Sequence, residues 1–183
     1  MADLVSLDYV KGYLGITGVK DDAVLSSLIT SESGRFEGLT GGPVLNVTIT
    51  GEEFSGDGGT VYFPLFAPLV SVTALTVDGS GVAKRTVVSG DGWVLDRGAV
   101  RLVGSTFSKG VKNCSIDYVA GYGATSPSEV QQAVAEMVAT KYRGKDRAGV
   151  SSASLAGESV SYLTDLLSEA VQQVIAKYTR VRV

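Results

Sequence analysis

Residues 126–144 constrain the fold most, because they predict a long helix with one apolar face. Ser126 is placed to cap this helix, Pro127 to occupy its first helical position, and Glu129 to complete a capping box. Gly144 provides a stop. One stripe recurs at helical spacing: Val130, Ala133, Val134, Met137, Val138 and Lys141. Such a face is buried only against other elements, so the rest of the chain must supply partners.

Two further helices are expected at the start of the chain. The first covers residues 6–15, with Ser6 as its cap and a glycine as its stop. The second begins at Asp21 or Asp22 and is stopped by Thr40-Gly41-Gly42-Pro43. Its apolar face is predicted to consist of Leu25, Leu28, Ile29, Phe36 and Leu39.

Between residues 44 and 120 the sequence pattern changes to that of β-strands. A shift of parity near Ala74 predicts a β-bulge, and Asp78-Gly79 predicts a hairpin turn. Strands are expected over residues 44–50, 61–63, 70–77, 85–88, 93–95, 100–103 and 112–119. We therefore expect an inserted antiparallel β-sheet or small barrel, and a chain of the α+β class.

The last part of the chain combines a polar loop, a helix and a tail. Residues 145–154 predict a mobile loop, and residues 159–162 an extended segment. A final helix is expected from about Asp165, with a broad apolar face: Leu166, Leu167, Ala170, Val171, Val174, Ile175 and Tyr178. The closing Thr179-Arg180-Val181-Arg182-Val183 alternates like a strand without a partner, which favours strand addition to a neighbouring protein over a frayed end.

Composition limits the class of protein. A chain of 183 residues with 44% hydrophobic and 19% charged residues predicts a globular domain, with or without a subdomain. No apolar run is long enough for a membrane span, and the start lacks the pattern of a signal peptide. The single Cys114 excludes an internal disulfide framework, so we expect synthesis in a reducing cytoplasm. A net charge of −3 gives no general reason for nucleic-acid binding.

The inventory of reactive residues argues against an enzyme. The chain contains no histidine, which removes Ser-His-Asp and Cys-His catalysis and histidine metal sites. Cys114 sits at an alternating strand position and is expected to be a buried hydrophobe, while Asp57 lies in a glycine-rich turn. The paired carboxylates are explained by a solvated strand edge at Glu52-Glu53 and by helix capping at Asp21-Asp22. We therefore expect no catalytic residue, metal or cofactor.

A small basic cluster follows the helix of residues 126–144. It consists of Arg143, Lys145 and Arg147. Two interpretations have equal weight: favourable placement at a helix C-terminus, or contact with an acidic partner or the DNA backbone.

Both ends of the chain carry a series of motifs, over roughly residues 4–43 and 116–178, whose order and spacing are fairly specific. The motifs are Leu7-Asp8-Tyr9-Val10-Lys11-Gly12-Tyr13-Leu14-Gly15-Ile16, Asp21-Asp22, Gly41-Gly42-Pro43, Tyr118-Val119-Ala120-Gly121-Tyr122-Gly123, Ser126-Pro127-Ser128-Glu129-Val130-Gln131-Gln132-Ala133-Val134, Tyr142-Arg143-Gly144-Lys145-Asp146-Arg147 and Gly157-Glu158-Ser159-Val160-Ser161-Tyr162. Together they resemble the head-tail connector (adaptor, or head completion) family of tailed bacteriophages.

The resemblance implies a structural virion protein, made in the bacterial host cytoplasm and located in the neck between head and tail. It implies a homo-oligomeric ring, typically of twelve copies, which docks on the portal protein, extends the DNA channel and meets a downstream stopper or tail protein. DNA would pass through the lumen without specific binding, and no membrane is involved. Residues 1–43 and 121–178 would form a discontinuous helical bundle core, residues 44–120 an inserted β subdomain, and residues 179–183 an extended tail.

The same analogy assigns two sets of contact residues. Portal contact falls on Tyr178, Thr179, Arg180, Val181, Arg182 and Val183. A ring interface or lumen-facing loop falls on Arg143, Lys145, Asp146 and Arg147. The alternative is a tail-side joining protein, a stopper or tail terminator, which would use the β segment as its main ring interface.

Overall fold

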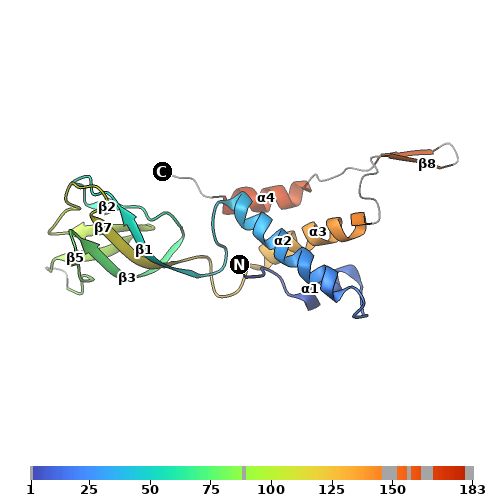
Figure 1. Cartoon of the computed structure of the whole chain (residues 1–183), viewed down its shortest axis with the longest axis horizontal. Coiled ribbons are helices and arrows are strands. Elements are labelled where there is room, and N and C mark those ends of the chain that lie inside the picture. The colour runs from blue at the N-terminus through green and yellow to red at the C-terminus, as the bar shows by residue number, and fades with distance from the viewer. Residues whose placement is uncertain (1, 88–89, 146–151, 156–157, 162–166, 180–183) are drawn as a thin grey trace. The chain divides into compact units, whose positions relative to one another are not determined.

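The computed structural model describes residues 2–87, 90–145, 152–155, 158–161 and 167–179. They fall into two compact units, and each is described by itself. The helical unit takes its residues from 2–41 and 126–179, and the β unit covers residues 42–125. In Figure 1 the helices carry the blue and the orange-to-red colours of the two ends of the chain, and most strands the colours of its middle. The fold is therefore mixed α+β.

The described part of the helical unit contains four helices: α1 (Leu7–Leu14), α2 (Asp22–Thr40), α3 (Ser128–Gly144) and α4 (Glu169–Tyr178). Helix α3 packs against the other three. Its buried surface is accordingly wider than the predicted stripe, because Ala135 and Ala139 are buried as well. Their small side chains are compatible with neighbours on several sides of α3.

Local signals set the ends of α1 and α2. The Ser6 hydroxyl accepts a hydrogen bond from the Tyr9 N–H at 3.2 Å, so the predicted cap is confirmed. Gly15 and Gly41 end the two helices in the left-handed conformation, with φ of 72° and 80°. These stops are also confirmed.

The buried face of α2 differs from the prediction. Leu39 is 44% exposed, which makes its assignment to the apolar face wrong, and Thr40 is buried in its place. Glu32 and Ser33 also lie on the buried face. The Ser33 hydroxyl accepts a hydrogen bond from the Leu4 N–H at 3.0 Å, which joins the start of the chain to α2. The prediction of a purely apolar face is wrong because this face of α2 also contacts backbone groups, such as the Leu4 N–H, which need hydrogen-bond partners.

The predicted capping box of α3 is wrong. Helix α3 begins at Ser128, with Pro127 in the N-cap position. The Ser126 carbonyl accepts a hydrogen bond from Gln131 Nε2 at 2.8 Å. The Glu129 carboxylate, which the box requires, instead accepts hydrogen bonds from two residues of α4. A tertiary contact has therefore displaced the local one.

The final helix starts later than predicted. It begins at Glu169, and the Ser168 hydroxyl caps it by accepting a hydrogen bond from the Val171 N–H at 3.2 Å. Residues 162–166 lie outside the described part of the chain. Upstream, β8 (Ser152–Leu155) and β9 (Glu158–Ser161) form an antiparallel pair. The prediction of a loop through residue 154 is therefore wrong for residues 152–154.

The β unit contains two antiparallel sheets. The first has the order β1 (Val47–Phe54), β7 (Cys114–Ala120), β3 (Leu69–Val77) and β4 (Ser80–Gly81). The second has the order β2 (Val61–Tyr62), β6 (Ala99–Val103) and β5 (Gly92–Asp96). Within the described residues of this unit both sheets stay open, so the barrel alternative is wrong.

Several details of the β unit follow the sequence closely. The pairing of β3 with β7 shifts register between Val72 and Ala74, which confirms the bulge. Asp78 and Gly79 both take positive φ, 50° and 76°, in the β3–β4 turn. The strand predicted at 85–88 is wrong for residues 85–87, which lie outside the strands, and Val88 lies outside the described chain.

One core fills the β unit. Its members are Leu75, Trp93, Val100, Leu102, Phe107, Cys114, Ile116, Tyr118 and Ala120. Three of them alternate along β7 with the partly exposed Ser115 and Asp117, as the pattern predicts.

Candidate assembly surfaces

The end of α4 is fastened to the start of α3. Tyr178 OH and Lys177 Nζ each donate a hydrogen bond to Glu129 Oε1 at 2.5 Å. These bonds, from Lys177 first and Tyr178 second, hold the pKa of the Glu129 carboxyl below its usual range. Tyr178 is only 6% exposed. The last turn of α4 is thus an integral part of the helical unit.

Of the six residues that the analogy assigns to portal contact, the structure describes only Tyr178 and Thr179. Tyr178 is buried in the helical unit. Thr179 follows it as an exposed residue whose N–H and hydroxyl both bond to the Ile175 carbonyl at 2.7 Å. Arg180, Val181, Arg182 and Val183 lie outside the described residues. Contact of this segment with a portal remains a prediction.

Of the four residues assigned to the ring or lumen contact at the end of α3, the structure describes Arg143 and Lys145. Lys145 Nζ donates a hydrogen bond to Asp21 Oδ1 at 3.3 Å and lies 4.1 Å from the centroid of the Tyr142 ring. Hydrogen bonding by Tyr142 and then Lys145 lowers the pKa of Asp21, and bonding to Tyr142 raises the pKa of Lys145. Arg143 is exposed. Asp146 and Arg147 lie outside the described residues, and a ring or lumen contact remains a prediction.

A groove runs between α3 and α4 that the sequence analysis did not identify. It encloses a volume of about 360 Å³. Its apolar lining comes from Ala133, Ala170, Val171 and Val174. Its polar lining comes from Glu129, Gln132, Glu136, Gln173 and Lys177. Two of its lining residues, Ala133 on α3 and Ala170 on α4, are small, but the sequence alone does not show that these two faces meet.

An aromatic pair on α1 was also missed. Tyr9 and Tyr13 are 40% and 43% exposed, and their spacing of four residues places them on one side of the helix. A tyrosine left half in water keeps a large apolar surface and a hydroxyl available for contact with a partner.

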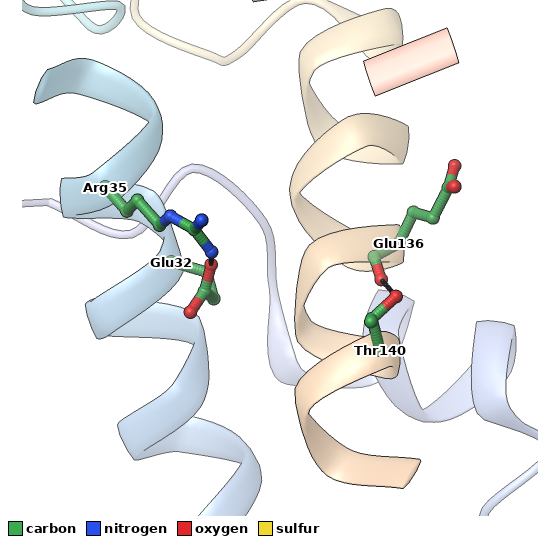
Figure 2. Close-up of polar contacts among 4 residues, drawn as sticks. All are labelled: Glu32, Arg35, Glu136 and Thr140. Carbon is green, nitrogen blue, oxygen red and sulfur yellow. Dashed lines mark hydrogen bonds and ion pairs between the residues drawn. The ribbon is translucent and has the colours of Figure 1, made fainter. Parts of the chain in front are cut away.

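A buried carboxylate lies on α2 and faces the middle of the helical unit. The Glu32 side chain is 5% exposed, and its Oε2 lies 3.4 Å from Arg35 Nη1 one turn later (Figure 2). On the neighbouring α3, the Thr140 hydroxyl donates a hydrogen bond to the Glu136 carbonyl at 2.9 Å. The ion pair compensates a charge that would be costly to bury alone. Its geometry is that of a structural contact.

In the β unit, Glu52 lies on β1, an edge strand of its sheet as predicted, but its carboxylate is not simply solvated because it fixes the loop that follows β2. Its Oε1 accepts hydrogen bonds from Tyr62 OH at 2.7 Å and the Leu65 N–H at 2.9 Å, and its Oε2 from Tyr118 OH at 2.5 Å. Burial, and then Glu52, raises the pKa of Tyr62 above its ordinary value. The following loop keeps Phe63 and Leu65 54% and 55% exposed.

The remaining candidates for chemistry have structural explanations. Asp57 Oδ1 accepts a hydrogen bond from the Gly59 N–H at 2.6 Å, which confirms a turn. Cys114 is 1% exposed, and burial raises the pKa of its thiol, as expected for a small buried hydrophobe. Among the described residues no group of three metal-binding side chains comes together. No helix in the described part of the chain combines the length and apolarity of a membrane span.

Comparison with known protein families gives one match that spans both units. A family model described as "HCP: Head completion protein" matches residues 3–181. No curated protein sequence matches the chain. The fold is similar to three solved structures of gene transfer agent (GTA) particles, at sequence identities that support likeness of fold alone.

In the neck of an empty GTA particle, computed with C6 symmetry, the TM-score is 0.62 at 21% identity, over 98% of this chain and 91% of that chain. In the neck of a native GTA particle, computed with C12 symmetry, it is 0.58 at 20% identity, over 100% and 96%. In the virion of a native gene transfer agent particle it is 0.56 at 23% identity, over 98% and 91%.

Proposed function

Because the chain belongs to the head completion protein family, we propose that it is a structural virion protein that joins the head of a phage-like particle to its tail. It forms a homo-oligomeric ring on the portal and extends the DNA channel. The observation that carries this proposal is the length of the family match, which spans both units. The C12 and C6 symmetries used for the two similar neck structures favour a ring.

We assign the two units different parts of this role. The helical bundle core, residues 1–43 and 121–178, carries the contacts of the ring. The inserted β subdomain, residues 44–120, provides a second surface, and residues 179–183 are the tail that contacts the portal. Helix α3 supports this division because it packs against α1, α2 and α4, which gives the core a rigid centre.

The portal contact uses Tyr178, Thr179, Arg180, Val181, Arg182 and Val183. Tyr178 would act as the anchor, because its hydroxyl is bonded to Glu129 while the segment after it leaves a fixed helix end. The alternation of arginine and valine in that segment suits addition to a strand with acidic neighbours.

The lumen or ring contact uses Arg143, Lys145, Asp146 and Arg147. DNA passes these residues without specific binding, and a net charge of −3 agrees with a channel that does not hold its cargo. The downstream surface of the ring meets a stopper or tail protein.

The second candidate function is a tail-side joining protein, a stopper or tail terminator, that assembles through the β unit. One observation favours it: the loop fixed by Glu52 and Tyr118 presents the half-exposed Phe63 and Leu65. A fixed loop loses little entropy on binding, so this is a plausible contact surface.

Imaging of purified chain mixed with portal assemblies tests the proposal. We expect rings seated on the portal. Binding to tail tubes alone, with bare portals, would contradict the adaptor function and favour the second candidate.

A truncation after Thr179 tests the tail. It retains Lys177 and Tyr178, so the helical unit keeps its contacts to Glu129 while residues 180–183 are lost. We expect an unchanged thermal unfolding midpoint and loss of portal attachment. The double variant Lys20→Ala with Lys109→Ala is the matched control, because it also removes two positive charges, both exposed, but should still attach.

A further inference from the structure

A ring of identical chains sets a geometric requirement. Under cyclic symmetry each copy presents two different surfaces, one to each neighbour. We propose that these surfaces are the tyrosine pair Tyr9 and Tyr13 on α1 and the groove between α3 and α4, so that the pair of one copy inserts into the groove of the next. This inference rests on the proposed ring.

The two surfaces are built from different helices of the helical unit. Helices α1 and α4 each pack against both α2 and α3. In Figure 1, α4 is drawn above and α1 below the middle of α2. The tyrosines belong to α1, whereas the groove is lined by residues of α3 and α4 alone. The two surfaces therefore share no residue, and one copy can present both of them at once.

The groove suits the tyrosine pair in size and chemistry. Its volume of about 360 Å³ is enough for phenol rings, and its apolar lining is built from small or β-branched side chains. Gln132 and Gln173 on its exposed rim supply hydrogen-bond donors and acceptors for tyrosine hydroxyls. Tyrosine gives large contact area for the loss of few rotamers, which is why it recurs as an anchor of interfaces.

Both surfaces are also held in place before assembly. The groove lies between α3 and α4, which the bonds from Lys177 and Tyr178 to Glu129 keep together at one end. The tyrosines sit on a helix that has both ends capped, by Ser6 and Gly15. Surfaces that need no rearrangement lose less free energy on binding.

Paired cysteines test this contact directly. The full chain with both Tyr13→Cys and Gln173→Cys is assembled on portal assemblies and then oxidised. We expect a ladder of disulfide-linked oligomers up to the size of the ring. Native Cys114 adds no background because it is 1% exposed. Each single variant should remain monomeric, and a mixture of the two single variants should stop at dimers.

The outcomes separate this inference from the function on which it rests. If wild-type chain forms no ring on portals, the proposed function fails and the inference with it. If rings form but the double-cysteine chain gives no ladder, the groove contact is overturned and the ring stands. A disulfide-linked dimer from either single variant would indicate a contact between like surfaces and also overturn it.

A loss-of-contact variant gives a second readout. Tyr9→Ala with Tyr13→Ala should reduce ring yield by roughly tenfold or more, with an unchanged unfolding midpoint because both side chains are partly exposed. Tyr122→Ala is the matched control, since Tyr122 is 41% exposed but lies in the β unit, and its ring yield should equal that of wild type. Equal yields from the double variant and this control would contradict the proposal.

Discussion

The helical unit and the β unit differ in how they bury their cores and in where they leave apolar side chains exposed. In the helical unit, stability comes from side chains packed around α3, and the remaining partly exposed aromatic residues and the groove lie along helix faces. In the β unit, two backbone ladders enclose one core, and the most exposed apolar residues, such as Val111, Leu65 and Phe63, lie outside the strands, while Val47, Val70 and Leu95 are less exposed and lie on strands. Under the proposed function, the helical unit provides helix faces for the ring, whereas the β unit provides mainly loops.

The polar contacts of the two units show the same contrast. In the helical unit, Lys177 and Tyr178 hold Glu129 and so fix one helix against another. In the β unit, Asp78 accepts hydrogen bonds from Ser108 and from Asn113 Nδ2, at 2.9 Å for the latter, and so fixes loops against one another. Loss of a helical contact should therefore move a surface, while loss of a β contact should loosen a loop.

The largest expected effect comes from the two cores. Phe36→Ala in α2 and Phe107→Ala in the β unit each remove a side chain that is at most 1% exposed, and each should cost about 3–5 kcal/mol of unfolding free energy. Denaturant unfolding followed separately in each unit measures this. If the helical unit carries the ring contacts, Phe36→Ala should also lower ring yield, whereas Phe107→Ala should lower it less. An equal loss of rings in both variants would contradict this difference between the units.

A smaller effect is expected at Glu52. Glu52→Gln removes the charge that accepts hydrogen bonds from Tyr62 and Tyr118, and should cost about 1.5–3 kcal/mol. Glu53→Gln is the matched control, because its side chain is 55% exposed, and it should change stability by less than about 0.5 kcal/mol. Urea unfolding of the two variants distinguishes them, and ring yield should stay at the wild-type level in both.

The smallest effect is a dependence on pH. The folded state lowers the pKa of Glu129 below its ordinary 4.5, so its contribution to stability is present above that pH and is lost as the pH falls through the folded value. Glu129→Gln should therefore differ from wild type at neutral pH and converge with it in acid. Asp78→Asn should behave likewise below the ordinary aspartate value of 3.8, since Ser108 and Asn113 lower its pKa.

Thermal midpoints measured from neutral pH into the acid range check both variants. The Glu129 variant should affect the helical unit and the Asp78 variant the β unit. A difference from wild type that stays constant across this range would contradict the assignment of these carboxylates.

Sequence reasoning succeeded where the deciding contacts are local. The Ser6 cap, the glycine stops at Gly15 and Gly41, and the turn at Asp78 each depend on a few neighbouring residues, and all are confirmed. The capping box at Glu129 failed because residues 48 and 49 positions away, Lys177 and Tyr178, bind that carboxylate. A local pattern carries no information about such a competitor.

The candidate surfaces were harder to predict for the same reason. Charged residues such as Arg143, and an alternating segment such as the C-terminal one, stand out in a sequence. The predicted contact residues therefore lie there. The groove depends on which faces of α3 and α4 meet, and neither Ala133 nor Ala170 indicates that alone. The spacing of Tyr9 and Tyr13 was visible, but their exposure depends on how α1 packs against α2 and α3.

Hydroxyl-radical footprinting of the full chain, before and after ring assembly on portals, tests most directly whether the helical unit carries the ring. It compares tyrosines of nearly equal exposure in the two units: Tyr9 and Tyr13 at 40% and 43%, and Tyr122 at 41%. We predict that assembly protects Tyr9 and Tyr13 from modification and leaves Tyr122 as reactive as before. Protection of Tyr122 with unchanged modification of the α1 pair would contradict the account.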